Sequence, residues 1–220
     1  VLDLSRCDAK AIHARYGVVL AKTVRELRGE ACISFDDIAA PKQQIISSRS
    51  FAGVTADYQT VKAALSHHIS RAAEKLRLQE SVCAHVYVMI RTNPFREQDP
   101  QYRKTLLMPL PHPTADTAVL MKAAMAALHK GFIPGFRYHK CGVMLGEINP
   151  MNNLQTDLFA SVDDPKRLRL MGLLDSINKR QGSGTLQMAS TQLSAAWHMR
   201  AENRSPRYTT CWEELPVAYA

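Results

Sequence analysis

The sequence predicts an α+β fold in which a four-stranded antiparallel sheet carries two helices on one face. Three observations lead to this prediction. Residues 81–91 alternate strictly between two kinds of side chain, as a half-buried strand does. Residues 57–79 instead repeat apolar side chains at helical spacing. Between residues 44 and 148 such segments follow one another in the order βαββαβ, the split β-α-β arrangement.

The first half of this domain should be a strand, a helix and a strand. Residues 44–51 are apolar and then polar, which is typical of a short strand. The helix over residues 57–79 has one apolar stripe, made of Val61, Leu65, Ile69, Ala72 and Leu76. One face of the strand over residues 81–91 takes Val82, Ala84, Val86, Val88 and Ile90. The opposite face, expected to stay partly in water, takes Cys83, His85, Tyr87, Met89 and Arg91.

The second half repeats this pattern in the order strand, helix, strand. Residues 103–110 read as the third strand and residues 137–148 as the fourth. Between them we expect a helix that Thr114 or Asp116 caps and Gly131 ends. Both helices should cover the same face of the sheet, so that the other face is left for a partner.

Further segments flank this domain, which we place at residues 41–150. Residues 1–40 read as the end of a helical domain, with a helical segment that ends at Arg28-Gly29. A helix should begin at Pro165 and end at the Gly182-Ser183-Gly184 turn, followed by a small subdomain up to residue 220. The chain starts with Val and shows no signal-peptide pattern, so we expect part of a longer intracellular protein.

The net charge of +8 is concentrated in the middle of the chain. Residues 44–150 hold 13 Lys and Arg against 7 Asp and Glu, whereas the flanking segments hold 7 against 6 and 8 against 7. This excess suits a segment that meets a polyanion such as nucleic acid, although a solvated basic surface explains the charge equally well. The candidate DNA contacts are Lys42, Ser47, Ser48, Arg49, Ser50, Arg91, Lys104, Arg137, His139 and Lys140. Only Tyr87 offers an aromatic ring there, so base stacking is a poor fit.

The sequence offers no credible catalytic or metal site. The five cysteines are far apart and form no CxxC pair, which indicates reduced thiols in a cytoplasmic protein. The histidines form no HExxH motif. The pairs Asp36-Asp37 and Asp163-Asp164 lack the strand context of a two-metal site. We therefore predict no catalytic residue and no metal ligand in this chain.

The segment NLQTDLF, residues 153–159, allows two interpretations. Turn and breaker residues surround it, so it belongs neither to the middle of a strand nor to a long helix. It could form one helical turn in which Leu154 and Leu158 pack back onto the domain. The alternative, which spacing alone favours less, is a linear motif that offers Leu158 and Phe159 to a partner.

Seven blocks of the sequence together resemble the C-terminal half of UmuC-type Y-family translesion DNA polymerases, a group that includes the MucB, ImpB and SamB proteins. The blocks are TVRELRGEAC, KQQIISSRSF, RAAEKLR, KCGVMLGEI, QTDLF, GSGTL and SPRYTT, in this order. The resemblance implies the end of the thumb in residues 1–40 and the little finger in residues 41–150. It also implies a linker with a clamp-binding motif in residues 151–164 and a UmuC-type extension in residues 165–220.

The resemblance also implies partners. QTDLF is similar to the pentapeptide that docks these polymerases on the bacterial sliding clamp, and it comprises Gln155, Thr156, Asp157, Leu158 and Phe159. Gln155 would bond the rim of the clamp pocket, and Leu158 and Phe159 would fill it. A processed UmuD-type subunit and RecA would act with the parent protein in the SOS response. Mg²⁺ would bind in a palm domain, which this chain lacks. The alternative is a stand-alone DNA- or clamp-binding protein, a truncated relic.

Overall fold

The computed structural model describes residues 1–34, 40–153, 165–191, 197 and 205–216. The chain forms two units, Val1–Pro41 and Lys42–Ala220. Within the described part, no helix is both long and apolar enough to cross a membrane.

The first unit contains three short helices, α1 (Leu2–Arg6), α2 (Ala9–Tyr16) and α3 (Val18–Glu26). The sequence predicted helical structure that ends at Arg28-Gly29, and α3 ends close to that point; the structure divides the helical segment into three. The chain breaks at Gly17, whose φ of 89° and ψ of 177° lie outside the helical region and suit glycine alone. Asp8 begins α2 by accepting hydrogen bonds from the backbone N–H groups of the first turn.

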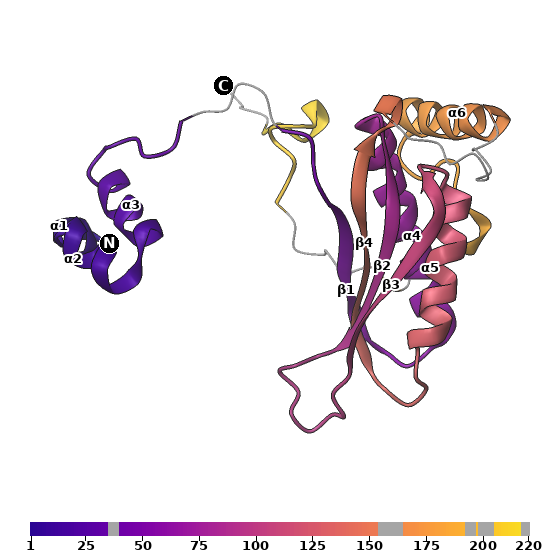
Figure 1. Ribbon diagram of the computed structural model, residues 1–220, viewed down its shortest axis with the longest axis horizontal. Helices are drawn as coiled ribbons and strands as arrows, with labels where there is room; N and C mark the ends of the chain where they lie inside the picture. Colours follow the sequence, from indigo (N-terminus) through magenta and orange to yellow (C-terminus); the bar gives the residue numbers. More distant parts are fainter. Residues whose placement is uncertain (35–39, 154–164, 192–196, 198–204, 217–220) are drawn as a thin grey trace. The chain divides into compact units, whose positions relative to one another are not determined.

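The second unit is built on a four-stranded antiparallel sheet, as predicted. Its strands are β1 (Ile45–Thr55), β2 (Ser81–Thr92), β3 (Arg103–Thr114) and β4 (Tyr138–Pro150). Their order across the sheet is β1-β4-β2-β3, and every neighbouring pair is antiparallel (Figure 1). Each helical crossover therefore spans one intervening strand, so that β4 lies between β1 and β2, and β2 lies between β3 and β4.

Helices α4 (Tyr58–Leu78) and α5 (Thr117–Gly131) pack on the same face of this sheet (Figure 1). Asp57 caps α4, and Asp116 caps α5 by accepting from Ala118 N at 2.7 Å. The core between the helices and the sheet is fully buried; its large side chains include Leu65, Ile69, Leu76, Val86, Val88, Ile90, Leu120, Leu128, Val143 and Leu145. The expected coverage of one face is thus confirmed.

The predicted alternation along β2 holds from Val86 to Arg91 and fails near the start of the strand. Val86, Val88 and Ile90 are buried against the helices, whereas the side chains between them are half-buried. Cys83 was assigned to the wet face, and this assignment is wrong, because the residue is fully buried. Its Sγ lies 3.7 Å from the Thr114 carbonyl oxygen, where the β2–β3 pairing loses its regular register.

Helix α6 (Pro165–Gln181) follows the sheet domain and begins and ends as predicted. A bidentate ion pair fastens it to α4: Arg77 Nε and Nη2 donate to the two Asp175 oxygens at 2.6 and 2.7 Å. Nη1 of the same guanidinium donates to Ala115 O at 2.9 Å and to Thr117 Oγ1 at 2.8 Å. Because this pair is largely buried, displacing α6 would leave an unpaired charge in the interior, and the pair therefore fixes the position of α6 on the helical layer.

The described residues also include three turns of 3-10 helix: η1 (Met151–Asn153), η2 (Ala189–Thr191) and η3 (Trp212–Glu214). Trp197 is buried, and its ring lies 5.3 Å from that of His67 and 5.6 Å from that of His68 on α4. Trp212 is 88% exposed. The two tryptophans of the predicted subdomain thus have opposite environments.

We predict that Gly142→Ala weakens the attachment of β1 to β4. A Cβ at Gly142 would lie 2.2 Å from Ser48 Cβ and 2.8 Å from the Ser47 carbonyl oxygen, so the two strands must separate locally. Overpacking of this kind costs about 1–3 kcal/mol. Urea unfolding should show that loss for Gly142→Ala and little change for Gly53→Ala, because a Cβ at Gly53 meets nothing within 4 Å. Equal effects of the two substitutions would contradict the close contact.

Candidate nucleic-acid interface

The uncovered face of the sheet carries a line of cations across three strands. In antiparallel strands, directly opposite residues point to the same face. Lys140 on β4 is opposite both Ser50 on β1 and Arg91 on β2, and Arg91 is opposite Arg103 on β3. These four residues, Ser50, Lys140, Arg91 and Arg103, are the basic row.

Two further rows lie parallel to the basic row on the same face. The middle row contains small or uncharged side chains, namely Ser48, Gly142, Met89 and Thr105. The apolar row contains Ile46, Met144, Tyr87 and Leu107. The open face is therefore divided along the strands into a cationic part and an apolar part.

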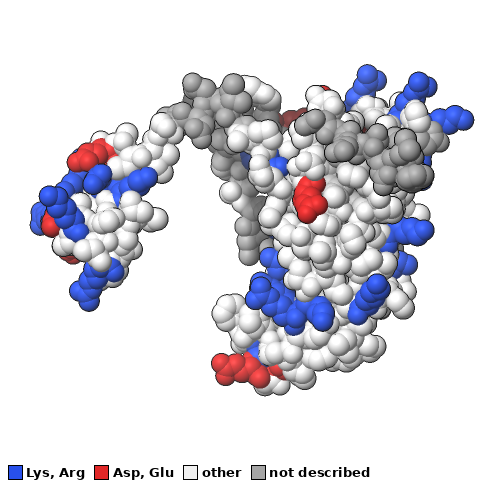
Figure 2. Space-filling model, in the orientation of Figure 1, with Lys and Arg blue, Asp and Glu red and all other residues white. Residues whose placement is uncertain are grey.

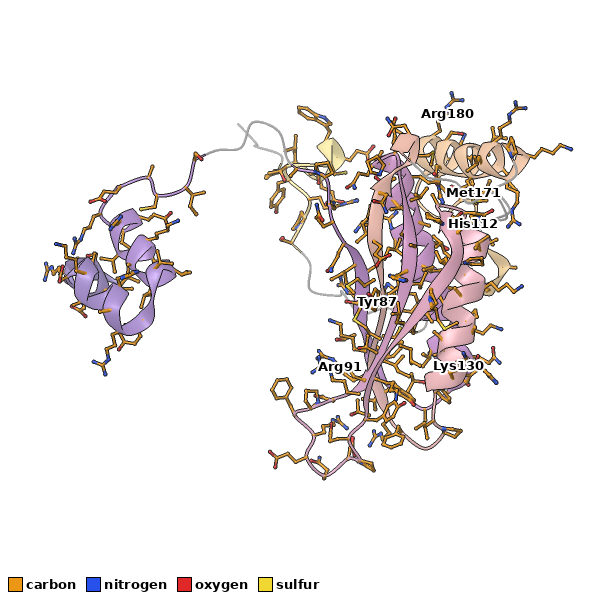
Figure 3. All side chains as sticks on the ribbon, in the orientation of Figure 1. Tyr87, Arg91, His112, Lys130, Met171 and Arg180 are labelled. Atoms are coloured by element: carbon orange, nitrogen blue, oxygen red, sulfur yellow. The ribbon has the colours of Figure 1, made fainter. Side chains whose placement is uncertain are left out.

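The basic row is electrostatically uncompensated. Within the described residues, its three cations form no ion pair, and like charges placed directly opposite each other destabilise a sheet. Arg91 Nε is buried and has no hydrogen-bond partner there. Lys and Arg gather low on the sheet in Figure 2, in the part of the view where Figure 3 labels Arg91. An anion bound at this row would relieve the repulsion and satisfy the free donor.

His139 lies beside the basic row because β4 contains a bulge. The β2–β4 pairing moves from Arg91–Lys140 to Thr92–Tyr138, so that His139 is the extra residue. Burial lowers the pKa of His139, and the neighbouring charges of Arg91, Lys140 and Arg96 lower it further. The imidazole is consequently neutral at pH 7 and adds no fourth charge to the basic row.

Arg137 lies just before β4 and is partly neutralised by an acidic side chain. Its Nη1 is 3.5 Å from Asp99 Oδ1, and Arg96 Nη1 is 3.9 Å from Asp99 Oδ2. Asp99 thus joins the β2–β3 loop to the chain entering β4. Arg137 borders the basic row and is less available to a ligand than the three cations within it.

Several predicted contacts do not lie on the open face. Ser47 Oγ is 3.1 Å from His68 Nδ1 of α4, so it points toward the helices. Arg49 is opposite the buried Cys141 and therefore shares the helix-covered face. The Lys42 backbone pairs with the side chain of Gln79, at the opposite end of the strands from the basic row.

Lys104 also differs from the prediction. It is opposite Ile90, which is buried against the helices, so its side chain leaves the sheet on that side. Arg103, which was not among the predicted contacts, takes the position on the open face. The sequence of β3 contained the information needed to place Arg103. Leu106, Met108 and Leu110 pack on the core, so the odd-numbered residues of this strand, including Arg103, point to the open face.

The remaining predicted groups have these positions. Ser48, Ser50, Arg91 and Lys140 lie on the open face, as expected from the sequence. The clamp-motif residues Gln155, Asp157, Leu158 and Phe159 lie outside the described residues, as do Asp36-Asp37 and Asp163-Asp164.

In the part that the structure describes, no three His, Cys, Asp or Glu residues gather as metal ligands do. Burial raises the pKa of the Cys83 and Cys141 thiols to about 12, so both are protonated at neutral pH.

We predict that His139 makes the protein less stable in acid. Its pKa is lowered on folding, so between that pKa and 6.5 the unfolded chain binds more protons, and stability falls as pH decreases through 6.5. Urea unfolding at pH 7 and pH 5 should therefore show a smaller loss for His139→Gln than for the wild type. His129→Gln, at an exposed position of α5, is the control. The same pH dependence in all three proteins would contradict the placement of His139 beside the cations.

Two family models match the chain. The one described as the impB/mucB/samB family C-terminal domain matches residues 42–158, and a domain of unknown function (DUF4113) matches residues 168–218. SamB of Salmonella typhimurium is 39% identical over 218 residues, covering 99% of this chain and 51% of the relative. UmuC of the same species is 39% identical over 97% of this chain, and MucB of Escherichia coli is 39% identical over 99%.

Solved structures of Y-family polymerases align more distantly. DinB from Sulfolobus solfataricus aligns with a TM-score of 0.37 and 15% identity, covering 66% of this chain and 40% of that chain. An insertion ternary complex of Dbh DNA polymerase aligns with a TM-score of 0.36 and 13% identity, covering 66% and 39%.

The sequence comparisons extend along nearly the whole chain, and the larger family model covers the four-stranded sheet with both of its helices. The chain spans about half the length of the curated relatives it matches. It belongs to the impB/mucB/samB family, the UmuC-like family that the sequence motifs indicated, and it contains the C-terminal domain of that family.

Proposed function

We propose that this chain is the DNA-holding and clamp-docking part of an error-prone UmuC-like DNA polymerase that acts in translesion synthesis. The observation that carries the proposal is the basic row on the open face of the sheet. Three cations stand in line across β4, β2 and β3 without acidic partners in the described residues. Such an arrangement costs folding stability and becomes favourable when a polyanion lies on it.

The basic row suits the DNA backbone rather than the bases. Neighbouring strands are about 4.8 Å apart, so the cations of three strands span roughly 10 Å. Arg and Lys side chains, helped by the hydroxyls of Ser48 and Ser50, bind phosphate oxygens and position a protein without reading sequence. The domain would therefore hold a primer–template in place whatever its sequence or damage, as lesion bypass requires.

The QTDLF motif would supply a second, weaker attachment. Leu158 and Phe159 would fill a pocket of the bacterial sliding clamp, each contributing about 1.5–3 kcal/mol before ordering costs, which supports micromolar affinity. A weak clamp contact and a weak DNA contact on one chain raise residence at the primer end by avidity. Tethering is thus the mechanism we assign to this region.

The other parts of this proposal rest on family membership. Nucleotidyl transfer would belong to a palm domain with Mg²⁺-binding carboxylates, outside these 220 residues. A processed UmuD-type subunit and RecA would assist the whole protein in the cytoplasm during the SOS response.

Substitution of two adjacent residues of like charge, Arg103 and Lys104, tests the DNA contact. We expect the chain to bind primer–template DNA with strong salt dependence. Arg103→Ala should lower the slope of log K against log salt by about one unit, because one phosphate contact is lost. Lys104→Ala, with the same charge change on the other side of the strand, should change the slope much less. Fluorescence anisotropy across a salt series measures both.

Two results would contradict the proposal. A slope near zero for the wild type would exclude a phosphate-binding surface. Equal effects of Arg103→Ala and Lys104→Ala would show that general charge, and not the basic row, holds the DNA.

The clamp contact is tested by Leu158→Ala combined with Phe159→Ala. If these side chains bind the clamp, clamp retention in a pull-down should disappear while the melting temperature barely changes, since exposed side chains contribute little to folding. Leu154→Ala, just outside the motif, is the matched control and should retain the clamp. Should the double variant still retain the clamp, or lose several kcal/mol of stability as buried truncations do, the assignment is wrong.

A further inference from the structure

Helix α6 exposes a stripe of apolar side chains to the solvent. Leu170 is 57% exposed, Leu173 is 60% exposed and Ile177 is 36% exposed. Successive residues of an α-helix are turned by about 100°, so these three side chains lie within an arc of roughly 60° and extend about 10 Å along the helix. We call Leu170, Leu173 and Ile177 the α6 stripe. Their spacing of i, i+3 and i+7 is that of the anchors by which one helix binds another.

The α6 stripe is not the side by which α6 is attached to the sheet domain. Met171 is buried and lies on the domain side of the helix, whereas Arg180 points away from it (Figure 3). Arg167 Nε is 2.6 Å from Asp116 Oδ2, and this ion pair and the one formed by Asp175 hold the helix in place. The rotation of α6 is therefore fixed, and the stripe is presented to a partner without further ordering of the helix.

Cations border the α6 stripe on the side away from the domain. Residues 165–181 hold five Lys and Arg against one Asp. Arg169 and Arg180 lie next to the stripe around the helix, and within the described residues neither of them forms an ion pair. Lys and Arg project into the solvent in the part of Figure 2 where Figure 1 shows α6. An apolar surface and an uncompensated positive charge thus lie side by side on one helix.

A pocket adjoins the α6 stripe on its other side. Leu174, four residues after Leu170, lines this pocket of about 210 Å³ between α4 and α6. Leu186, Met188 and Trp197 contribute further apolar parts of its wall. A helix lying on the stripe would therefore find a recess for one large apolar side chain, as the anchors of protein interfaces require.

We propose that the α6 stripe is the docking site for an acidic amphipathic helix of a partner protein. The apolar side chains of that helix would pack on Leu173 and its neighbours in the stripe. Its Asp and Glu side chains would pair with Arg169 and Arg180, as charged residues do beside the seam of a coiled coil. The inference goes beyond the proposed DNA and clamp contacts, because it concerns a different element of the chain.

Charge and size favour this occupant over three others. A second copy of the chain would bring the same cations against each other, which disfavours self-association through α6. DNA would satisfy the cations, but its phosphates offer nothing to the apolar side chains beside them. An anionic membrane binds helices with a broad apolar face, whereas α6 offers three side chains and has its other side packed on the domain.

The test uses the full chain and a synthetic acidic helix of about three heptads, with Leu at positions a and d and Glu at e and g. A twin peptide with Lys in place of Glu is the charge control. We expect micromolar binding of the acidic helix in fluorescence anisotropy and much weaker binding of the twin. Leu173→Ser combined with Ile177→Ser should weaken binding at least about tenfold, because both anchors are lost. Ile133→Ser, at an exposed position after α5, should bind as the wild type does.

A charge exchange locates the contact on α6. Arg169→Glu combined with Arg180→Glu should weaken binding of the acidic helix at least about tenfold and should create binding of the Lys twin. Lys122→Glu combined with Lys130→Glu makes the same charge change at exposed positions of α5 and should do neither. Because Arg169 and Arg180 are exposed, this variant should keep the melting temperature of the wild type, and it decides the question even if the stripe variant unfolds.

The proposal is overturned if the wild type does not bind the acidic helix, or if the charge-exchange variant binds both peptides as the wild type does. It is also overturned if Arg103→Glu abolishes binding and the α6 variants do not, because the peptide would then lie on the basic row. Loss of duplex DNA or of phosphatidylglycerol vesicles by the α6 variants, with peptide binding unchanged, would equally contradict it.

Discussion

The position of β4 between β1 and β2 is the constraint on which the open face depends. Each crossover helix must return over one intervening strand, and both helices arrive on the same side of the sheet. Among the described residues no helix packs on the other side, and the register of β4 decides what that side presents. Because Lys140 is paired with Arg91, and Arg91 with Arg103, the charges of three separate strands fall in one line. A shift of β4 by one residue would send Lys140 to the core side and bury a charge.

The like charges of the basic row lower the stability of the sheet, and the packing of the rest of the unit has to compensate for this loss. Facing like charges weaken the strand pairing locally, whereas the buried aliphatic core beneath α4 and α5 stabilises the same strands. The neutral state of His139 limits the repulsion in the absence of a ligand. The Arg77–Asp175 pair fastens α6 to the helical side of the unit, away from the open face. Surface charge for binding and packing for stability are thus separated onto opposite faces of one sheet.

The sequence predicted the kinds of elements and their order, and it placed Arg91 correctly, because β2 alternates clearly from Val86 onward. The assignment of sides failed on β1 and β3. Both contain adjacent apolar residues, Ile45-Ile46 and Leu106-Leu107, which leave the period-2 pattern ambiguous, so Ser47 and Lys104 were put on the wrong side and Arg103 was missed. Strand order and the bulge at His139 depend on partners distant in the chain, and no local pattern contains them.

The central claim is that the open face, and not the helical face, holds the DNA backbone. Backbone amide shifts in a two-dimensional NMR titration with primer–template DNA test this claim most directly. The account predicts salt-sensitive shifts concentrated at residues 48–50, 89–91, 103–105 and 139–142, with α4 and α5 nearly unchanged. Shifts concentrated on α4, α5 or α6, with the four strand segments unaffected, would contradict it.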